Sequence, residues 1–356
     1  MYNPKEKFKE ELIATARKLV RPGYGLLAAD ESLGNIEKKF KSLGIEVTEE
    51  NRRAYREMLF TTKDLNKYIS GIIMFDETVY HSTKSGVRFT ELMKSLDIIP
   101  GIKVDKGPVN IGGTLEESAT TGIDGLGDRC KKYYQEGCRF AKWRAILKIG
   151  KGCPSEISLR ENSYNLARYA SICQDNGLCP IVEPEVLTDG DHTIEECAKA
   201  CEKVFSAVQK ALIDQDVILE GMLFKVNMVT EGSDCKKKAS PAEIAWFTVR
   251  TYSRSFVAAV PGIVMLSGGQ SEECASINLN AISNVKGIPK PWPISFSYAR
   301  ALQSTPMKTW GGKPENFEKA QEELIKRAKA NSEASLGKYE GGSGSTESLY
   351  VKGHVY

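Results

Sequence analysis

The sequence predicts a single α/β domain, a (β/α)₈ or TIM barrel, and two observations lead to this fold class. About eight short apolar stretches alternate with helical stretches along the 356 residues. No turn signal joins one of these stretches directly to the next, so parallel strands connected by helices are expected. A doubly wound open sheet is the alternative architecture, and the number of strands disfavours it.

The first half of the chain supplies four of the expected strands. A helix is expected at the start, over residues 5–20, because apolar residues recur there at helical spacing and Pro22-Gly23 ends the pattern. Short apolar runs then predict strands over 24–30, 70–75, 98–105 and 139–147. Helical spacing between them predicts helices over 35–42, 48–60 and 125–137.

The second half repeats the same alternation. Apolar runs bounded by Gly or Pro predict strands over 178–186, 220–230, 262–269 and 292–298. Amphipathic spacing predicts helices over 158–176, 193–213, 241–259, 271–283 and 315–336.

The last residues differ in composition from the rest of the chain. Residues 1–337 are expected to form the catalytic barrel, and residues 338–356, with Gly341-Gly-Ser-Gly-Ser345, are expected to form a mobile tail. The alternative interpretation is a disordered terminus without a role.

Composition excludes several classes of partner. Forty-nine basic and forty-six acidic residues give a net charge of +3, which is too balanced to indicate nucleic-acid binding. The charged residues 1–21 lack the apolar core of a secretory signal, and no apolar run is long enough for membrane insertion.

The cysteines predict a reducing, cytoplasmic environment. There are nine of them, an odd number, and none form a Cys-x-x-Cys pair. Cys197 and Cys201 lie one helical turn apart, so that a pair of small core side chains is favoured over a metal or redox pair. The three histidines are isolated and indicate no zinc site.

Charged and hydroxyl side chains recur where the expected strands end. In a barrel the carboxyl ends of all strands meet at one mouth, so these side chains are expected to gather there. The set comprises Asp30, Lys103, Lys142, Arg144, Glu183, Glu185, Lys225, Ser267 and Arg300.

Lys225 lies within the apolar stretch 220–230 and is the candidate nucleophile. Burial and a second cation, Lys142, both favour the neutral amine, which can attack a ketone and form an imine. Glu183 and Glu185 share one face of the preceding strand and could move the protons that this step needs. An edge-strand lysine that reaches water is the alternative interpretation.

Two groups of residues can bind anions on either side of this lysine. Ser267-Gly-Gly-Gln-Ser271 lies between a strand and a helix, where backbone N–H groups favour phosphate, and Arg300 follows the next strand. Lys103, Ser32 and Lys39 could hold another anion. Two anion sites that flank an imine-forming lysine indicate a bisphosphorylated sugar.

Several collinear motifs resemble those of the eukaryotic class I fructose-1,6-bisphosphate aldolases over nearly the whole chain. They are Leu27-Ala-Ala-Asp-Glu-Ser32, Gly101-Ile-Lys-Val-Asp-Lys-Gly107, Phe140-Ala-Lys-Trp-Arg144, Ile181-Val-Glu-Pro-Glu185, Asn227-Met-Val-Thr230, Leu266-Ser-Gly-Gly-Gln-Ser-Glu-Glu273 and the terminal Tyr356.

The resemblance implies a glycolytic and gluconeogenic lyase that cleaves fructose 1,6-bisphosphate reversibly to dihydroxyacetone phosphate and glyceraldehyde 3-phosphate. Lys225 would form the Schiff base, and Glu183, supported by Glu185 and Lys142, would act as the general acid and base. Asp30 would accept the proton of the C4 hydroxyl as the C3–C4 bond breaks. Tyr356 would take part in protonating the enamine.

The same similarity implies a wider set of substrate-binding residues, a homotetramer, and in some members an actin or other cytoskeletal partner. No metal or other cofactor is implied, because the imine is the electron sink. The expected substrate-binding residues are Ser32, Asn35, Lys39, Lys103, Arg144, Ser267, Gly268, Gly269, Ala299 and Arg300.

The chain departs from the family pattern at a few positions. Phe224 and Val226 replace a Leu and a Pro beside the nucleophile, and Ala299 replaces a Gly before Arg300. A positive φ at Ala299 would be strained. Lys39 stands where an Arg is common, and Asn35 replaces a hydroxyl residue.

Two other functions remain open at this point. A transaldolase-like imine-forming barrel would be indifferent to a second phosphate, and a non-enzymatic scaffold would need none of the catalytic residues. The preference between fructose 1,6-bisphosphate and fructose 1-phosphate is not fixed by the sequence.

Overall fold

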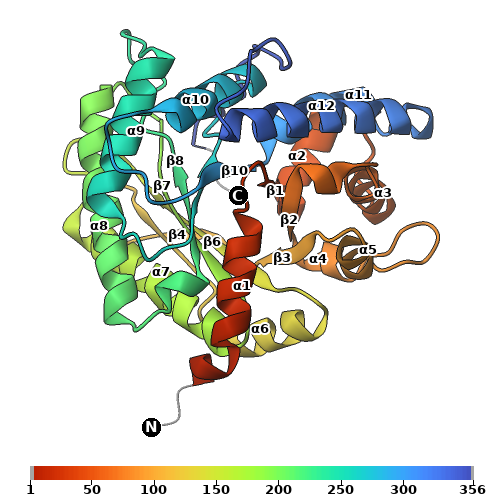
Figure 1. Ribbon diagram of the computed structural model, residues 1–356, viewed down its shortest axis with the longest axis horizontal. Helices are drawn as coiled ribbons and strands as arrows, with labels where there is room; N and C mark the ends of the chain where they lie inside the picture. Colours follow the sequence, from red (N-terminus) through yellow and green to blue (C-terminus); the bar gives the residue numbers. More distant parts are fainter. Residues whose placement is uncertain (1–3, 354–356) are drawn as a thin grey trace.

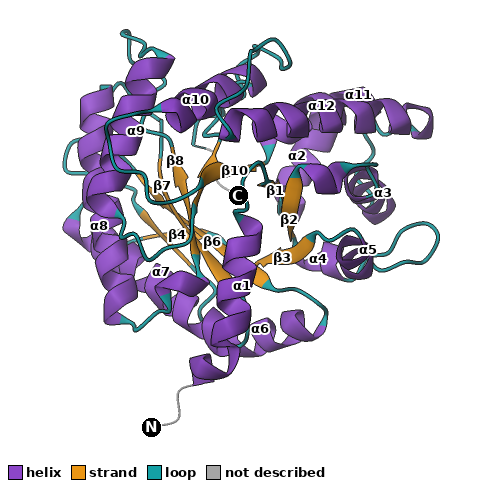
Figure 2. Cartoon of the chain, viewed as in Figure 1, coloured by secondary structure: helices purple, strands orange, loops and turns teal. Residues whose placement is uncertain are grey.

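A computed structural model describes residues 4–353 of the chain. Eight of its strands are parallel and close into a barrel in the order β1-β10-β9-β8-β7-β6-β3-β2, with helices around them (Figures 1 and 2). The barrel strands are β1 (Gly25–Ala29), β2 (Ile69–Met74), β3 (Ile99–Lys103), β6 (Phe140–Leu147), β7 (Cys179–Val186), β8 (Leu223–Asn227), β9 (Ile263–Leu266) and β10 (Ile294–Tyr298). The predicted fold class is confirmed.

Helices cover the outer face of the barrel because every strand must bury two apolar faces. Local sequence signals set several helix starts, such as the capping boxes that Thr193 forms with Glu196 and Ser240 forms with Glu243. The helices are α1 (Lys9–Leu19), α2 (Leu33–Ser42), α3 (Glu49–Phe60), α4 (Asp76–Val79), α5 (Phe89–Ser95), α6 (Leu126–Gln135), α7 (Glu156–Asp175), α8 (Ile194–Asp214), α9 (Pro241–Ser255), α10 (Glu272–Asn284), α11 (Arg300–Trp310) and α12 (Phe317–Ser335).

Helix α1 closes the amino-terminal end of the barrel and crosses its centre in Figure 1. Leu12, Ala16 and Leu19 of this helix belong to one buried cluster with inward side chains of the strands, including Leu26 and Phe140. One end of the barrel is therefore filled with apolar side chains, which leaves the carboxyl end as the place for a polar site.

Some elements differ from those predicted. A two-stranded antiparallel hairpin, β4 (Pro108–Asn110) and β5 (Ser118–Thr120), lies between β3 and α6, so the expectation of no hairpin is wrong. Helices α4, α5 and α11 were also not predicted from the sequence. Helix α11 contains Pro306 in its interior. Strand β8 is shorter than predicted, because Glu220 lies in the 3₁₀ helix η3 (Leu219–Gly221).

The tail continues from α12 and packs against α10. The Glu273 carboxylate accepts hydrogen bonds from Gly342 N (2.7 Å), Gly344 N (2.9 Å) and the Tyr339 hydroxyl (2.7 Å). Arg327, which is fully buried on α12, donates from Nη1 to the Ser343 hydroxyl at 2.9 Å. The first part of the tail is thus anchored by buried charges, and the predicted mobility of residues 338–356 stays a prediction.

Candidate active site

Lys225 occupies the middle of β8 and points into the barrel. Its side chain is 4% exposed, and its Nζ lies 3.1 Å from Oε1 of Glu183 on the adjacent strand β7. The candidate nucleophile and its candidate proton carrier are therefore in direct contact. The alternative in which Lys225 reaches water from an edge strand is wrong, because β8 lies between β7 and β9.

Glu183 also contacts a second buried lysine. Its other oxygen, Oε2, lies 3.1 Å from Nζ of Lys142 on β6, and the same Nζ lies 2.8 Å from Oδ2 of Asp30, just after β1. Four predicted residues from four strands or strand ends thus form one chain of contacts, Lys225–Glu183–Lys142–Asp30.

Asp30 and Lys142 hold each other in the ionised state. Burial alone would raise the pKa of Asp30, but Lys142 and Lys225 outweigh it and lower the pKa below the usual 3.8. Burial would likewise lower the pKa of Lys142, but Asp30, Glu183 and Asp105 outweigh it and raise the pKa. Lys142 is therefore a fixed cation, and Asp30 is an ionised carboxylate at neutral pH.

A second ion pair lies beside the first. Arg144 Nε is 2.5 Å from Oε2 of Glu185, and despite burial Arg144, Arg300 and Lys225 lower the pKa of Glu185. Glu185 is consequently held as an anion next to Lys225.

Asp105 was not among the predicted site residues, although the sequence placed it at a strand end. Its Oδ1 lies 2.6 Å from Lys103 Nζ, and its Oδ2 accepts a hydrogen bond from the backbone N of Arg144 at 3.2 Å. Asp105 therefore fixes Lys103 against the end of β6. The signal for it was the spacing of two residues, which puts Lys103 and Asp105 on the same face of an extended segment.

The candidate phosphate loop follows β9. Gly268 and Gly269 have φ values of 58° and 83°, which favour glycine, and Ser267 is buried. Ser271 accepts a hydrogen bond from Cys274 N and caps α10, so the loop leads into a helix N-terminus that favours an anion. The expected strain at Ala299 is absent, because its φ is −101°.

The residues of this loop line a small cavity together with Lys225 and the two glutamates. The cavity measures about 10 Å³, room for about one water molecule. Arg300 lies on its wall, and its Nη1 donates a hydrogen bond to the backbone O of Leu349 in the tail at 2.5 Å. The tail therefore forms a hydrogen bond with the guanidinium of Arg300, which was predicted to bind phosphate.

Ser297 on β10 is a lining residue that the sequence reasoning missed. It is 1% exposed, and its hydroxyl has no hydrogen-bond partner among residues 4–353. A signal was present, since Ser295 and Ser297 alternate with apolar residues and must share one face of the strand. A buried free hydroxyl beside Lys225 can bind a polar atom of a substrate.

The candidate second phosphate site is less open than predicted. Asn35 donates from Nδ2 to the Ser32 hydroxyl at 3.1 Å, at the start of α2. Lys39 Nζ lies 2.7 Å from Oε1 of Glu31, whose Oε2 lies 2.7 Å from Arg56 Nη2. Lys39 is thus positioned by a buried carboxylate that the sequence reasoning did not include.

The Glu31 cluster gives a prediction about acid stability. Burial opposes ionisation, but Lys39 and Arg56 outweigh it and lower the pKa of Glu31 from 4.5 to about 2. The stabilisation is complete above pH 4.5 and is lost as the pH falls towards 2, which amounts to about 3 kcal/mol. We expect Glu31→Gln to remove this part of the acid destabilisation in urea unfolding measured from pH 6 to pH 3. The exposed Glu10→Gln variant should keep the wild-type pH dependence, and an unchanged dependence in Glu31→Gln would contradict the pairing.

The departures beside the candidate nucleophile Lys225 have a structural explanation. The Phe224 ring stacks on Phe256, which follows α9, with centroids 4.2 Å apart, and Phe224 and Val226 are fully buried. Because side chains alternate along a strand, these two residues face the helices while Lys225 faces the barrel interior. The larger aromatic side chain fills the layer outside the barrel and leaves free the face that carries Lys225.

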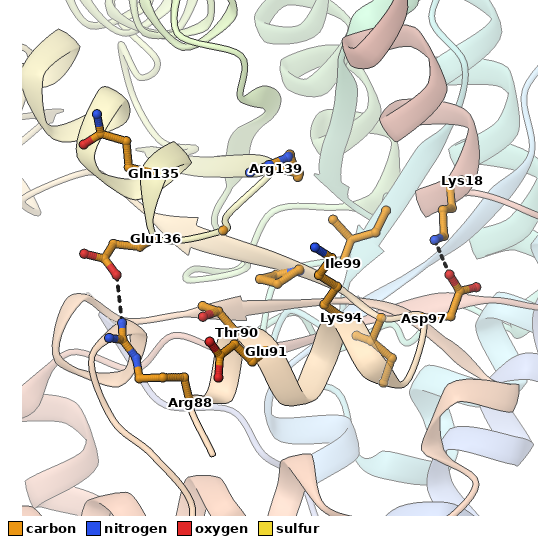
Figure 3. A pocket seen from close by; sticks show the side chains of 13 residues that line it. Lys18, Arg88, Thr90, Glu91, Lys94, Asp97, Ile99, Gln135, Glu136 and Arg139 are labelled. Atoms are coloured by element: carbon orange, nitrogen blue, oxygen red, sulfur yellow. Dashed lines mark hydrogen bonds and ion pairs between the residues drawn. The ribbon is translucent and has the colours of Figure 1, made fainter. Parts of the chain in front are cut away.

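A more open pocket of about 440 Å³ lies at the opposite end of the barrel (Figure 3). It is lined by the start of β3 and by Arg139, which precedes β6. Its charges are largely paired, Lys18 with Asp97 and Arg88 with Glu136. None of the predicted site residues lines it, so it is separate from the candidate active site.

Two further predictions concern the terminal Tyr356 and membrane insertion. Tyr356 lies outside residues 4–353, so its placement is not described. Among the described helices, none has the length and apolar content needed to cross a bilayer.

Comparison with known protein families gives a match over almost the whole chain. The model for the family "Fructose-bisphosphate aldolase class-I" matches residues 11–356. The cytosolic fructose-bisphosphate aldolase 4 of Arabidopsis thaliana is 59% identical over 97% of this chain and 89% of its own length. Fructose-bisphosphate aldolase 1 of Toxoplasma gondii is 55% identical over 99% of this chain and 98% of its own length.

A solved structure agrees with these relatives. The fructose-bisphosphate aldolase of Plasmodium falciparum, crystallised in a complex with TRAP and a small-molecule inhibitor, superposes with a TM-score of 0.93. It is 54% identical, and the match covers 94% of this chain and 97% of the other.

Proposed function

Because the chain belongs to the class I fructose-bisphosphate aldolase family, we propose that it cleaves its sugar bisphosphate through a Schiff base on Lys225. The predicted activity, a glycolytic fructose-bisphosphate aldolase, is confirmed by the family match and by relatives that match nearly the whole chain. The predicted cytoplasmic location is also confirmed, since relatives of this identity are cytosolic or cytoplasmic isozymes.

The observation that carries the proposed route is the position of Glu183 between two lysines, 3.1 Å from each Nζ. Lys225 can pass a proton to Glu183 and attack C2 of the ketose, and Glu183 can return a proton to the departing water of the carbinolamine. Lys142 remains charged on the far side of Glu183 and disfavours a second positive charge on the amine.

Asp30 and the imine together break the carbon–carbon bond. The ionised Asp30 accepts the C4 hydroxyl proton, the C3–C4 electron pair moves into the iminium, and glyceraldehyde 3-phosphate leaves. Tyr356 helps to protonate C3 of the enamine, and hydrolysis then releases dihydroxyacetone phosphate and free Lys225. Because the iminium accepts the electrons, the proposed route uses no metal or other cofactor.

The two phosphates of the substrate bind on opposite sides of the barrel mouth. Ser267, Gly268, Gly269 and Arg300 bind the C1 phosphate, and Ala299 supplies a backbone N–H at the start of α11. Ser32, Lys103 and Asn35 bind the C6 phosphate, with Lys39 held nearby by Glu31.

The proposed route is tested by trapping the imine. We expect dihydroxyacetone phosphate and borohydride to label the protein once per chain, and peptide mass spectrometry to map the adduct to Lys225. A label on any other lysine, or none, would contradict the route. A parallel assay with EDTA should retain full activity, whereas loss of activity on chelation would point to a metal-dependent mechanism.

We also propose the predicted homotetramer. Large apolar side chains are exposed on three neighbouring helices, Ile157 and Tyr164 on α7, Ile213 on α8 and Trp246 on α9, and such surfaces favour association. Light scattering coupled to size exclusion measures the mass directly. The actin or other cytoskeletal partner stays a prediction.

A further inference from the structure

Two buried thiols lie beside a buried histidine outside the candidate active site. Cys197 and Cys201 are one turn apart on α8, and their Sγ atoms are 3.9 Å apart. His192, in the loop before α8, is 6% exposed, and neither of its ring nitrogens has a hydrogen-bond partner of ordinary geometry among residues 4–353. We propose that these three residues form a peroxide-reactive site, in which Cys197 is oxidised and Cys201 then closes a disulfide that lowers turnover.

His192 is the feature that distinguishes this site from the pair of core side chains that the sequence favoured. A buried polar group without a hydrogen bond is costly, so a structural role alone does not account for this imidazole. Cys201 and His192 lower the pKa of the neighbouring Cys197 thiol from 9.0 to about 6, although burial opposes this. Burial and Cys197 raise the pKa of Cys201. Cys197 is therefore suited to react as a thiolate, and Cys201 remains a thiol.

Hydrogen peroxide is the only added reactant that the chemistry requires. Cys197 passes its proton to His192, and the thiolate attacks one peroxide oxygen, so that an S–O bond forms and the O–O bond breaks. The leaving hydroxide takes the proton from His192 and departs as water, which leaves a sulfenic acid on Cys197. The Cys201 sulfur then attacks this sulfur, an S–S bond replaces the S–O bond, and the hydroxyl leaves with the Cys201 proton as a second water. The two thiols lose two electrons, and the peroxide gains them.

An open pocket gives a small oxidant a route to the site. Cys197 contacts the backbone of Thr230, and Thr230 lines a pocket of about 480 Å³ between the loops that follow β8 and β9. Gly232 lines the same pocket and donates its backbone N–H to His192 O at 2.8 Å. The site therefore lies directly behind the wall of this pocket.

Asn227 connects the thiol pair to the strands of the active site. It lies two residues after Lys225 at the end of β8, and its Nδ2 donates to Cys201 Sγ at 3.4 Å. Its Oδ1 accepts a hydrogen bond from the backbone N of Val186, at the end of β7, at 2.9 Å. A disulfide turns the Cys201 sulfur away from Asn227 and towards Cys197. Oxidation therefore disturbs the amide that joins the strands carrying Lys225 and Glu183.

Closing the disulfide requires the first turn of α8 to move. Residues four apart on a helix have Cβ atoms about 5–6 Å apart, whereas a disulfide needs about 3.5–4.5 Å. Cys197 lies only four residues after the capping residue Thr193, and helix ends open more easily than helix centres. Disulfides with distorted geometry are reduced more easily, so we expect the oxidation to be reversible, as is usual for redox-sensing thiols in the cytosol.

The test maps the thiols of the whole protein after treatment with hydrogen peroxide. Lys199 lies between the two cysteines, so trypsin separates Cys197 from Cys201 and only a disulfide keeps the two peptides joined in mass spectrometry. We expect the joined peptides to appear and kcat for fructose 1,6-bisphosphate cleavage to fall roughly tenfold. Dithiothreitol should reverse both changes.

Three variants separate the steps of the reaction. Cys201→Ser should stop at the sulfenic acid on Cys197, which dimedone labels. Adding His192→Asn to this variant should slow the labelling about tenfold, because less of the thiol is ionised. Cys197→Ser should form no disulfide and should keep its kcat in peroxide.

A second buried pair of thiols provides the matched control. Cys130 and Cys173 have Sγ atoms 3.7 Å apart, but burial raises the pKa of Cys173 and no histidine is among the groups that act on it. Cys173→Ser should therefore respond to peroxide as the wild type does. The inference would be overturned if the joined peptides did not form, if Cys130 or Cys173 were oxidised first, or if the oxidised protein kept its full kcat.

Discussion

We expect Lys225→Met to lower kcat for fructose 1,6-bisphosphate cleavage by a factor on the order of 10⁴ or more. Methionine has a similar shape and an apolar surface, so it fits the buried position on β8 but cannot form the imine. The remaining groups can still bind phosphate, so substrate affinity should fall much less than turnover. Steady-state kinetics and equilibrium binding of the bisphosphate measure the two quantities separately.

The control for this variant is Lys210→Met on α8. Lys210 is exposed and, among residues 4–353, pairs only with Asp214 one turn away, so its replacement should leave kcat near the wild-type value. If Lys225→Met retained more than about a hundredth of the wild-type kcat while remaining folded by circular dichroism, Lys225 would not be the nucleophile.

The second large effect is expected from Lys142→Met, and it concerns stability as well as activity. Lys142 is 1% exposed and is the cation between Asp30 and Glu183. Removing one partner of a buried ion pair leaves uncompensated charge, and the expected cost is about 3–5 kcal/mol in the free energy of unfolding. Urea unfolding at pH 7 measures this loss.

The pH dependence of this loss identifies its cause. Lys142 and Lys225 lower the pKa of Asp30 from 3.8, so ionised Asp30 is stabilised above that pH and the stabilisation is lost as the pH falls. The difference between wild type and Lys142→Met should therefore shrink below about pH 4. A difference that is constant with pH would show that lost packing, not charge, destabilises the variant.

A double variant and a surface control complete this test. Asp30→Asn in the Lys142→Met background should recover part of the lost stability, because it removes the carboxylate that has lost its contact with Lys142, whereas Glu183 keeps Lys225. Lys41→Met, at an exposed pair with Glu37, should leave the stability within about 0.5 kcal/mol of wild type.

The sequence predicted the strands more reliably than their surroundings. Buried parallel strands are recognisable as short apolar runs, and the predicted run 178–186 became β7 over Cys179–Val186. The β4–β5 hairpin escaped prediction because its strands have three residues each and its Val109 is exposed. Helix α11 escaped because Pro306 normally argues against a helix interior.

The sequence predicted which residues gather at the candidate site, but not all of the contacts between them. Lys225, Glu183, Lys142 and Asp30 were predictable because charged residues in buried strands share the barrel mouth. The pairing of Lys39 with Glu31 was not, since both residues could equally have faced solvent. Ser297 was missed because a serine in a strand carries little information without its surroundings.

The sequence by itself determined the barrel, the positions of its strands and the identity of the central charged residues. These depend on periodicity within short segments, where a residue's direction follows from its neighbours in the chain. Only the tertiary structure decided that Glu183 lies between two lysines. The same holds for the hydrogen bond from Arg300 to the backbone O of Leu349 and for the one from the Tyr350 hydroxyl to Asp189. These contacts join segments far apart in the sequence, such as Asp189 and Tyr350, and packing of the whole chain fixes which donor meets which acceptor.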